Sequence, residues 1–166
     1  MTELNDFHAL VLVISIAPLL VAAVTDMREF RIPNECSALL LILYPVHIWL
    51  APMGIDILGG LLVGGCIFAV TFTLYALDRL GGGDVKLLSV MGLWAGPAYA
   101  ADLIVITTLA GAGLGLILLS RAGASIAMGL DRIGETSARD NVFSERMPYG
   151  VAITCGGLAT LWSLVG

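Results

Sequence analysis

The amino-acid sequence predicts an all-α protein that crosses a membrane six times, as one membrane-embedded domain over residues 1–166. Three observations support this fold class. Hydrophobic residues make up 58% of the chain and charged residues only 13%, whereas soluble domains carry about 25% charged residues. Apolar stretches recur that are long enough for a helix to cross a bilayer core of roughly 30 Å. The cationic residues, finally, fall in only three segments of the sequence.

Uncharged stretches of about 20 residues mark five of the expected transmembrane helices. These stretches are Phe7–Thr25, Cys36–Ile55, Ile57–Leu77, Leu103–Ser120 and Met147–Gly166. The first follows an acidic N-terminus without lysine or arginine, which favours a retained helix over a secretory signal peptide. A sixth, shorter stretch, Leu87–Ala101, contains Gly96-Pro97, which predicts a turn. It crosses the membrane only if its helix begins near Asp84.

Charge decides between five crossings and six, because lysine and arginine concentrate in cytoplasmic loops. With six crossings all eight cations lie on one side of the membrane, whereas five crossings would leave four arginines on the other side. The three groups are Arg28 and Arg31; Arg79 and Lys86; and Arg121, Arg132, Arg139 and Arg146. The sequence therefore predicts six crossings, both termini outside, and a mixed-charge cytoplasmic loop over about 121–146.

Composition also argues against several classes of function. The net charge of -5 is dispersed and forms no basic stripe, so a nucleic-acid partner is not expected. The cysteines form no CxxC or Cys/His cluster, which argues against a zinc site or a disulfide framework; they are Cys36, Cys66 and Cys155. The patterns Gly60-xxx-Gly64 and Gly111-xxx-Gly115 favour close helix packing inside the bundle over dimerisation.

Two aspartates at predicted helix ends are the candidate reactive groups. Asp26 follows the first apolar stretch, and Asp84 follows the three glycines of 81–83. The predicted topology places both at the cytoplasmic boundary, where an ionisable group beside lipid is costly and therefore a candidate functional residue. Each aspartate could instead cap or flank a helix. The glycines can adopt positive φ and admit an extended substrate strand beside Asp84.

A pair of carboxyl groups suits amide hydrolysis without a metal or a nucleophilic side chain. One carboxylate takes a proton from water, and one carboxylic acid donates a proton to the leaving amine. Two nearby carboxyls share a proton, because both do not readily ionise together. No serine has a histidine partner in the sequence, and His8 and His47 lack evident companions. Both histidines are expected to be structural and distant from the aspartates.

Three other acidic residues are expected to take no part in catalysis. Asp78 lies six residues before Asp84, and its neighbour Arg79 suggests an exposed ion pair. Asp56 and Asp102 fall in the turns that the topology places outside. A different class of function also fits a pair of membrane aspartates, namely a non-enzymatic transport or secretion subunit with a proton relay. That alternative predicts acids at mid-membrane depth, on a route to both faces.

The two acidic segments and the last helix carry motifs of a known family. Gly81-Gly82-Gly83-Asp84-Val85-Lys86 matches a GxGDxK motif, and Asp26 is followed by Arg31-Ile32-Pro33-Asn34. Pro148-Tyr149-Gly150-Val151-Ala152 opens the last stretch in the manner of a PYGxA motif. In these motifs and their order, over nearly the whole chain, the sequence resembles the type IV prepilin peptidases, a branch of the GxGD membrane aspartyl proteases.

The resemblance implies an enzyme of the bacterial inner membrane that cleaves the leader of type IV pilin-like precursors on the cytoplasmic side, with periplasmic termini. Asp26 and Asp84 are then the catalytic pair, and no metal or cofactor is implied. The supporting residues are Gly81, Gly82, Gly83, Lys86, Arg31, Ile32, Pro33 and Asn34. Lys86, the only lysine, is expected either to orient the segment at the interface or to tune the pair electrostatically.

Departures from the family pattern indicate which form of prepilin peptidase the sequence resembles. Larger prepilin peptidases carry a cytoplasmic insert with paired CxxC motifs and often N-methylate the mature pilin. The sequence contains no CxxC motif, so it resembles the compact, peptidase-only form of Flp/Tad pilus systems, and methyltransferase activity is not expected. A GxGD protease that cuts within transmembrane helices is the remaining enzymatic alternative, against which the Arg-Ile-Pro-Asn segment argues.

Overall fold

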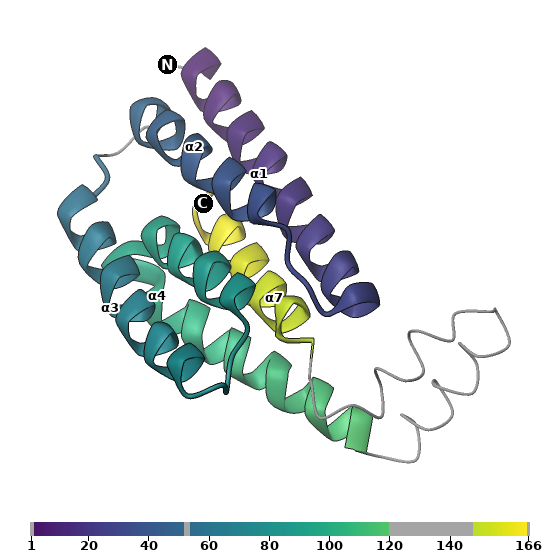
Figure 1. Cartoon of the computed structure of the whole chain (residues 1–166). Coiled ribbons are helices and arrows are strands. Elements are labelled where there is room, and N and C mark those ends of the chain that lie inside the picture. The colour runs from purple at the N-terminus through teal and green to yellow at the C-terminus, as the bar shows by residue number, and fades with distance from the viewer. Residues whose placement is uncertain (1, 52–53, 120–147, 166) are drawn as a thin grey trace, which may run out of the picture.

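The chain folds into a bundle of helices in a computed structural model that describes residues 2–51, 54–119 and 148–165. The elements are α1 (Thr2–Glu29), α2 (Asn34–Leu50), α3 (Ile57–Ala76), α4 (Gly82–Leu119) and α7 (Tyr149–Ser163). This architecture confirms the predicted all-α class (Figure 1). The predicted cytoplasmic loop over about 121–146 lies outside the described residues.

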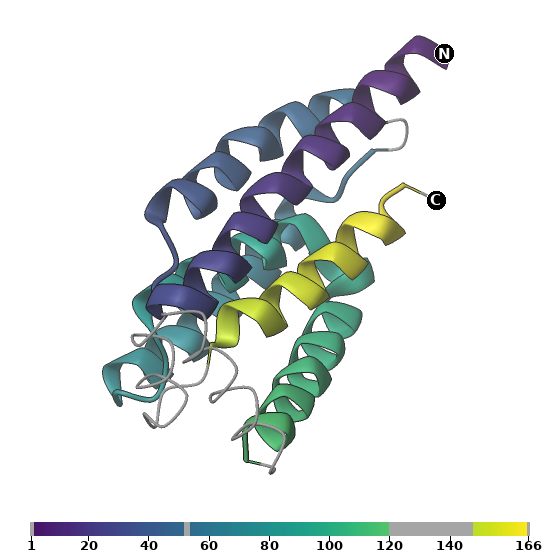
Figure 2. The same ribbon diagram turned by 90° about the vertical axis from the view of Figure 1, so that its right-hand side faces the viewer.

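The first helix begins and the last helix finishes at the same end of the bundle. Helix α1 contacts α2 and α7, and α4 contacts α2, α3 and α7. Both ends of the chain lie at one end of the bundle, whereas α1 finishes and α7 begins at the other end (Figures 1 and 2). The last turn of α1, which carries Asp26, therefore lies beside the first turn of α7.

Helix α4 is broken in its middle, at the turn that was predicted from Gly96-Pro97. Gly96 has φ 54° and ψ -171°, which is not helical, and Pro97 has no N–H with which to continue the hydrogen-bond ladder. Two helical segments, 82–95 and 97–119, therefore meet at this point and run in nearly opposite directions (Figure 1). The break returns the chain toward the end of the bundle at which α4 began.

Close packing of α3 on the first segment of α4 depends on small residues. A Cβ atom on Gly60 would lie 3.0 Å from the carbonyl oxygen of Leu93, and one on Gly64 would lie 3.1 Å from that of Ser89. Only glycine lets the two backbones approach to this distance. The Gly60-xxx-Gly64 pattern therefore serves packing within the bundle, as expected.

The exterior of the bundle is that of an integral membrane protein. Leucine side chains such as Leu58, Leu109 and Leu116 are about 70% exposed, and water disfavours apolar patches of this extent. Three helical stretches are long and apolar enough to cross a membrane: Phe7–Glu29, Ile57–Ala76 and Gly82–Ile117. The apolar helix Asn34–Leu50 is shorter. Six crossings and their orientation remain predictions.

Candidate active site

Asp26 lies in the last turn of α1 and is held by α7. Its side chain is only 5% exposed, and its Oδ2 accepts a hydrogen bond of 2.6 Å from the backbone N–H of Gly150. Gly150 is in the first turn of α7, where backbone N–H groups have no partner within their own helix. The carboxylate therefore caps α7 from another helix, with the favourable sign for a helix N-terminus.

The contact with Asp26 leaves no room for a side chain at Gly150. A Cβ atom there would lie 2.8 Å from Oδ2 and 2.9 Å from Cβ of Asp26. Sequence reasoning quoted this glycine only as part of the Pro-Tyr-Gly motif and gave it no place in the site. No local pattern could mark this glycine as a partner of Asp26, because the contact joins residues 124 positions apart.

Asp84 lies in the first turn of α4, and one of its oxygens caps its own helix. The Gly81 carbonyl accepts a hydrogen bond from the N–H of Val85, while the Gly81 N–H donates to Oδ2 of Asp84 at 3.2 Å. This is the side-chain half of a capping box. The residue is 8% exposed, and Oδ1 has no hydrogen-bond partner among the described residues. Buried carboxylate oxygens are normally paired, so Oδ1 is the unsatisfied atom of the site.

The three glycines before Asp84 do not behave as the sequence suggested. Gly96 is the only described glycine with positive φ, so the glycines of 81–83 do not use the positive φ that they could adopt. Gly82 and Gly83 are helical, because α4 begins at Gly82, close to Asp84 as expected. The backbone that comes close is that of Ile32, whose carbonyl oxygen would lie 3.2 Å from a Cβ atom on Gly83.

A side-chain contact joins the two turns that carry the aspartates. Phe30 has φ 51° and ends α1, and Pro33 is the extended N-cap of α2. Lys86 Nζ then donates a hydrogen bond of 2.7 Å to Oδ1 of Asn34, the first residue of α2. Together with the contact between Gly83 and Ile32, this bond holds the start of α4 against the turn between α1 and α2.

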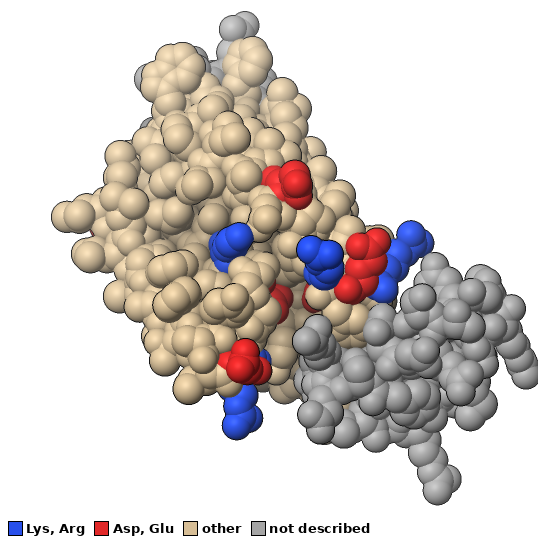
Figure 3. Space-filling model, in the orientation of Figure 1, with Lys and Arg blue, Asp and Glu red and all other residues tan. Residues whose placement is uncertain are grey.

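Both aspartates line one pocket of about 290 Å³ at this end of the bundle. Its lining is Asp26, Phe30, Arg31, Ile32, Asn34, Gly81, Gly82, Gly83, Asp84 and Lys86. The structure thus brings together every predicted site residue except Pro33, and adds Phe30, which sequence reasoning did not single out. Charged side chains surround a hollow in Figure 3.

The pocket has the groups that hydrolysis by two carboxyls requires. Asp26 and Asp84 line the same pocket, as two carboxyls that share a proton must. Oδ2 of each aspartate accepts a backbone hydrogen bond, and Oδ1 of Asp84 is buried without a partner in the described part of the chain. In the described part of the chain, no three His, Cys, Asp or Glu side chains converge as metal ligands do.

The other acidic residues lie apart from this pocket, although one expectation about them is wrong. No ion pair joins Asp78 to Arg79 within the described residues. Asp78 is exposed, has φ 56°, and ends α3 in a Schellman arrangement in which the Arg79 N–H bonds the Leu74 carbonyl. Asp56 caps α3 through a 2.8 Å bond from the Gly59 N–H. Asp102 is exposed.

The two histidines do have companions, which corrects the sequence reading. His8 Nε2 and His47 Nδ1 are 2.9 Å apart, and both side chains are buried. Their separation of 39 residues left no local pattern from which to infer the pair. As expected, neither histidine lines the aspartate pocket.

Comparison with known proteins supplies independent information. The sequence profile of the type IV leader peptidase family matches residues 13–116, a stretch that includes both aspartates. Proteins named prepilin leader peptidase/N-methyltransferase from Burkholderia pseudomallei strains 1026b and K96243 are each 28% identical over 152 residues, or 88% of this chain. The chain spans 44% of the length of these relatives. No solved structure matches the chain significantly.

Proposed function

Because the chain belongs to the type IV leader peptidase family, we propose that it is an aspartic endopeptidase that cleaves the leader of type IV pilin-like precursors. Asp26 and Asp84 are its proposed catalytic pair. The observation that carries the proposal is the position of Asp84, whose Oδ1 is buried and unpaired in a pocket that Asp26 also lines. A purely structural capping role would account for Oδ2 only.

The reaction needs one carboxylate and one carboxylic acid. The carboxylate takes a proton from water as the water oxygen attacks the scissile carbonyl carbon, and the acid protonates the amide nitrogen as the carbon–nitrogen bond breaks. The first group then holds a proton and the second has lost one, so a proton exchange between them restores the starting state. Water and peptide are consumed, and a carboxylic acid and an amine are released.

The supporting residues hold these carboxyls rather than react. The Gly150 N–H fixes Oδ2 of Asp26, and the Gly81 N–H fixes Oδ2 of Asp84. Lys86 keeps the turn at Asn34 against the start of α4. Fixed geometry of this kind supports catalysis, because a misplacement of about 1 Å can lower a rate 10²-fold.

We further propose that the bundle crosses the bacterial inner membrane six times, with periplasmic termini and a cytoplasmic pocket. Support comes from the reversal of α4 at Gly96 and from the position of both chain ends opposite the aspartates. Four cations are close in sequence to one of the two aspartates; they are Arg28, Arg31, Arg79 and Lys86. The positive-inside rule associates such cations with the cytoplasmic face of the membrane.

The test is cleavage of a co-expressed pilin precursor, followed as a shift on a gel. Asp26→Asn and Asp84→Asn each retain the shape and one acceptor oxygen but remove the acid, so we expect cleavage to fall by at least about 10²–10⁴-fold. Asp78→Asn is the matched control and should cleave at the wild-type rate. Near wild-type cleavage by either of the first two variants would refute the pair and favour a proton relay.

Chelation provides a second test of the same mechanism. Because two carboxyls suffice for the proposed chemistry, EDTA should leave the rate of leader cleavage unchanged in purified enzyme. A loss of activity that added divalent metal restores would sink the metal-free mechanism, whatever the aspartate variants do.

A further inference from the structure

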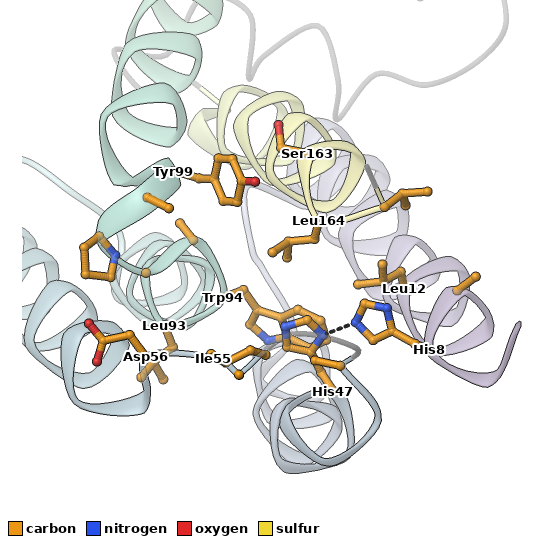
Figure 4. Close-up of a pocket in the computed structure, with 18 residues that line it drawn as sticks. His8, Leu12, His47, Ile55, Asp56, Leu93, Trp94, Tyr99, Ser163 and Leu164 are labelled. Carbon is orange, nitrogen blue, oxygen red and sulfur yellow. Dashed lines mark hydrogen bonds between the residues drawn. The ribbon is translucent and has the colours of Figure 1, made fainter. Parts of the chain in front are cut away.

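A second, larger cavity lies at the end of the bundle opposite the aspartates. It has a volume of about 610 Å³ and is enclosed by α1, α2, the break in α4 and the end of α7 (Figure 4). This size is within the range of small-molecule sites, which are mostly apolar with a few polar groups. The polar side chains here are His8, His47, Asp56, Tyr99 and Ser163.

One buried nitrogen in this cavity has no partner in the described part of the chain. The His47 ring is stacked on His8, with centroids 4.9 Å apart, and on Trp94, at 4.7 Å. Its Nδ1 bonds His8, but Nε2 is unpaired although the residue is only 1% exposed. Trp94 is satisfied, because its Nε1 donates to the Leu40 carbonyl. An unpaired nitrogen at this depth calls for a partner from outside the protein.

The electrostatic surroundings of the cavity favour a cation. Three helical segments end at this cavity, namely α2 at Leu50, the first part of α4 before Gly96, and α7 at Ser163, but α3 and the second part of α4 begin here. The partial charges of the helix ends are therefore mixed, and the Asp56 carboxylate supplies the full negative charge among the lining residues. No lysine or arginine is among the described residues that line the cavity. Aromatic faces, such as that of Trp94, also attract cations.

The depth of the cavity matches that of lipid headgroups. Eighteen residues separate His8 from Asp26 on α1, which corresponds to about 27 Å along a helix. A bilayer hydrocarbon core is about 30 Å thick, so the aspartate pocket and this cavity lie near opposite boundaries. A lipid that approaches from the membrane can therefore place its headgroup in the cavity while its acyl chains lie against the apolar exterior of the bundle.

We propose that this cavity binds the ammonium headgroup of an aminophospholipid of the phosphatidylethanolamine class. The ammonium group lies near the Asp56 carboxylate and donates to His47 Nε2, which requires the tautomer in which His47 Nδ1–H donates to His8. The hydroxyls of Tyr99 and Ser163, across the cavity from the histidines in Figure 4, can donate to the lipid phosphate. The proposal rests on the membrane location of the chain and not on its peptidase activity.

Trp94 provides a built-in probe for the test. The other two tryptophans, Trp49 and Trp162, are 83% and 80% exposed, so Trp49→Phe with Trp162→Phe leaves Trp94 as the only one. This double variant is placed in phosphatidylglycerol nanodiscs with increasing amounts of phosphatidylethanolamine that is brominated next to the headgroup. Site binding gives saturable quenching of Trp94 at low mole fraction, whereas brominated phosphatidylglycerol quenches weakly and in proportion to its amount.

Two comparisons assign the binding to the ammonium group. Asp56→Asn retains the α3 cap, since Asn caps as well as Asp does, but removes the charge, and should weaken binding about tenfold. Gly65→Ala, which meets nothing within 4 Å, is the matched control and should bind normally. Without any substitution in the cavity, phosphatidylethanolamine should displace the brominated lipid, whereas its N-acetylated, uncharged derivative should not.

Three results would overturn the proposal. Equal quenching by the two brominated lipids would show unselective contact with the bilayer. Displacement by the N-acetylated lipid would show that the ammonium group is not recognised. Full displacement by free ethanolamine at concentrations similar to those of the lipid would identify a small amine, and not a lipid, as the ligand.

Discussion

The two ends of the bundle each bury a pair of ionisable side chains, but the pairs are satisfied in different ways. His8 and His47 bond each other, and His47 also stacks on Trp94. Asp26 and Asp84 share one pocket, but each takes its hydrogen bond from the backbone at the start of a helix. The histidines thus hold α1 to α2, whereas the aspartates are themselves held by α4 and α7.

This difference suggests that the histidine pair stabilises the fold, whereas the aspartate pair is held in position by the fold. Mutual pairing uses Nε2 of His8 and Nδ1 of His47 for structure, and leaves Nε2 of His47 buried without a partner among the described residues. Backbone bonds to Oδ2 fix each carboxyl, and Oδ1 of Asp84 stays without a partner among the described residues. Substitutions at the aspartate end should therefore change the rate of cleavage, and substitutions at the histidine end should change stability. The predictions below are ordered by their expected effect on cleavage.

The largest contrast should come from Asp84→Asn, measured for stability as well as for cleavage. Asparagine still accepts the bond from the Gly81 N–H and caps helices about as well as aspartate. Cleavage should fall by at least about 10²-fold, while the thermal midpoint of the purified protein stays near that of wild type. An unchanged cleavage rate with a large loss of stability would make Asp84 a structural residue.

Gly150→Ala should have the next largest effect. The added methyl would lie within 3 Å of three Asp26 atoms, so the carboxyl must move and the bond to the Gly150 N–H must lengthen. A displacement of about 1 Å can lower the rate about 10²-fold, and the kcat for leader cleavage reports it. Gly65→Ala, in open space on α3, controls for the substitution itself. Cleavage by Gly150→Ala equal to that by Gly65→Ala would contradict the positioning of Asp26 by α7.

Much of the aspartate end could be predicted from the sequence, because its signals are local. The glycines and Lys86 accompany Asp84, and the Ile-Pro-Asn turn follows Asp26, each within a few residues. The break at Gly96-Pro97 was predictable for the same reason, since both residues act on their own backbone. Local spacing also indicated that Gly60 and Gly64 share one helix face.

Contacts between distant segments could not be predicted in this way. The bond between Gly150 and Asp26 spans 124 residues, and that between the histidines spans 39. Neither is visible in a local pattern, because both depend on which helices pack together. The glycines of 81–83 misled for a related reason, since the space beside Gly83 is used by Ile32 and that beside Gly82 by Tyr75 of the same chain.

Breaking the contact between Lys86 and Asn34 should have a smaller effect on cleavage. Both side chains are exposed, and exposed polar contacts contribute about 0.2–1 kcal/mol. Lys86→Met and Asn34→Ala should therefore each slow cleavage by less than about tenfold. The double variant should be no slower than the slower single variant, because both substitutions remove one bond. Multiplicative losses would instead show that each residue acts independently on the site.

The smallest effect on cleavage should accompany the largest loss of stability, at His47. His47→Phe keeps a ring stacked on Trp94 but leaves His8 Nε2 without its 2.9 Å partner. An unsatisfied buried group costs about 1–3 kcal/mol, so the thermal midpoint should fall clearly below that of the exposed control Trp49→Phe. The folded fraction should still cleave leader at the wild-type rate, since about 27 Å of helix separates the pairs. If cleavage were lost while stability was retained, the two ends would be coupled, and the division between stabilising and positioned pairs would fail.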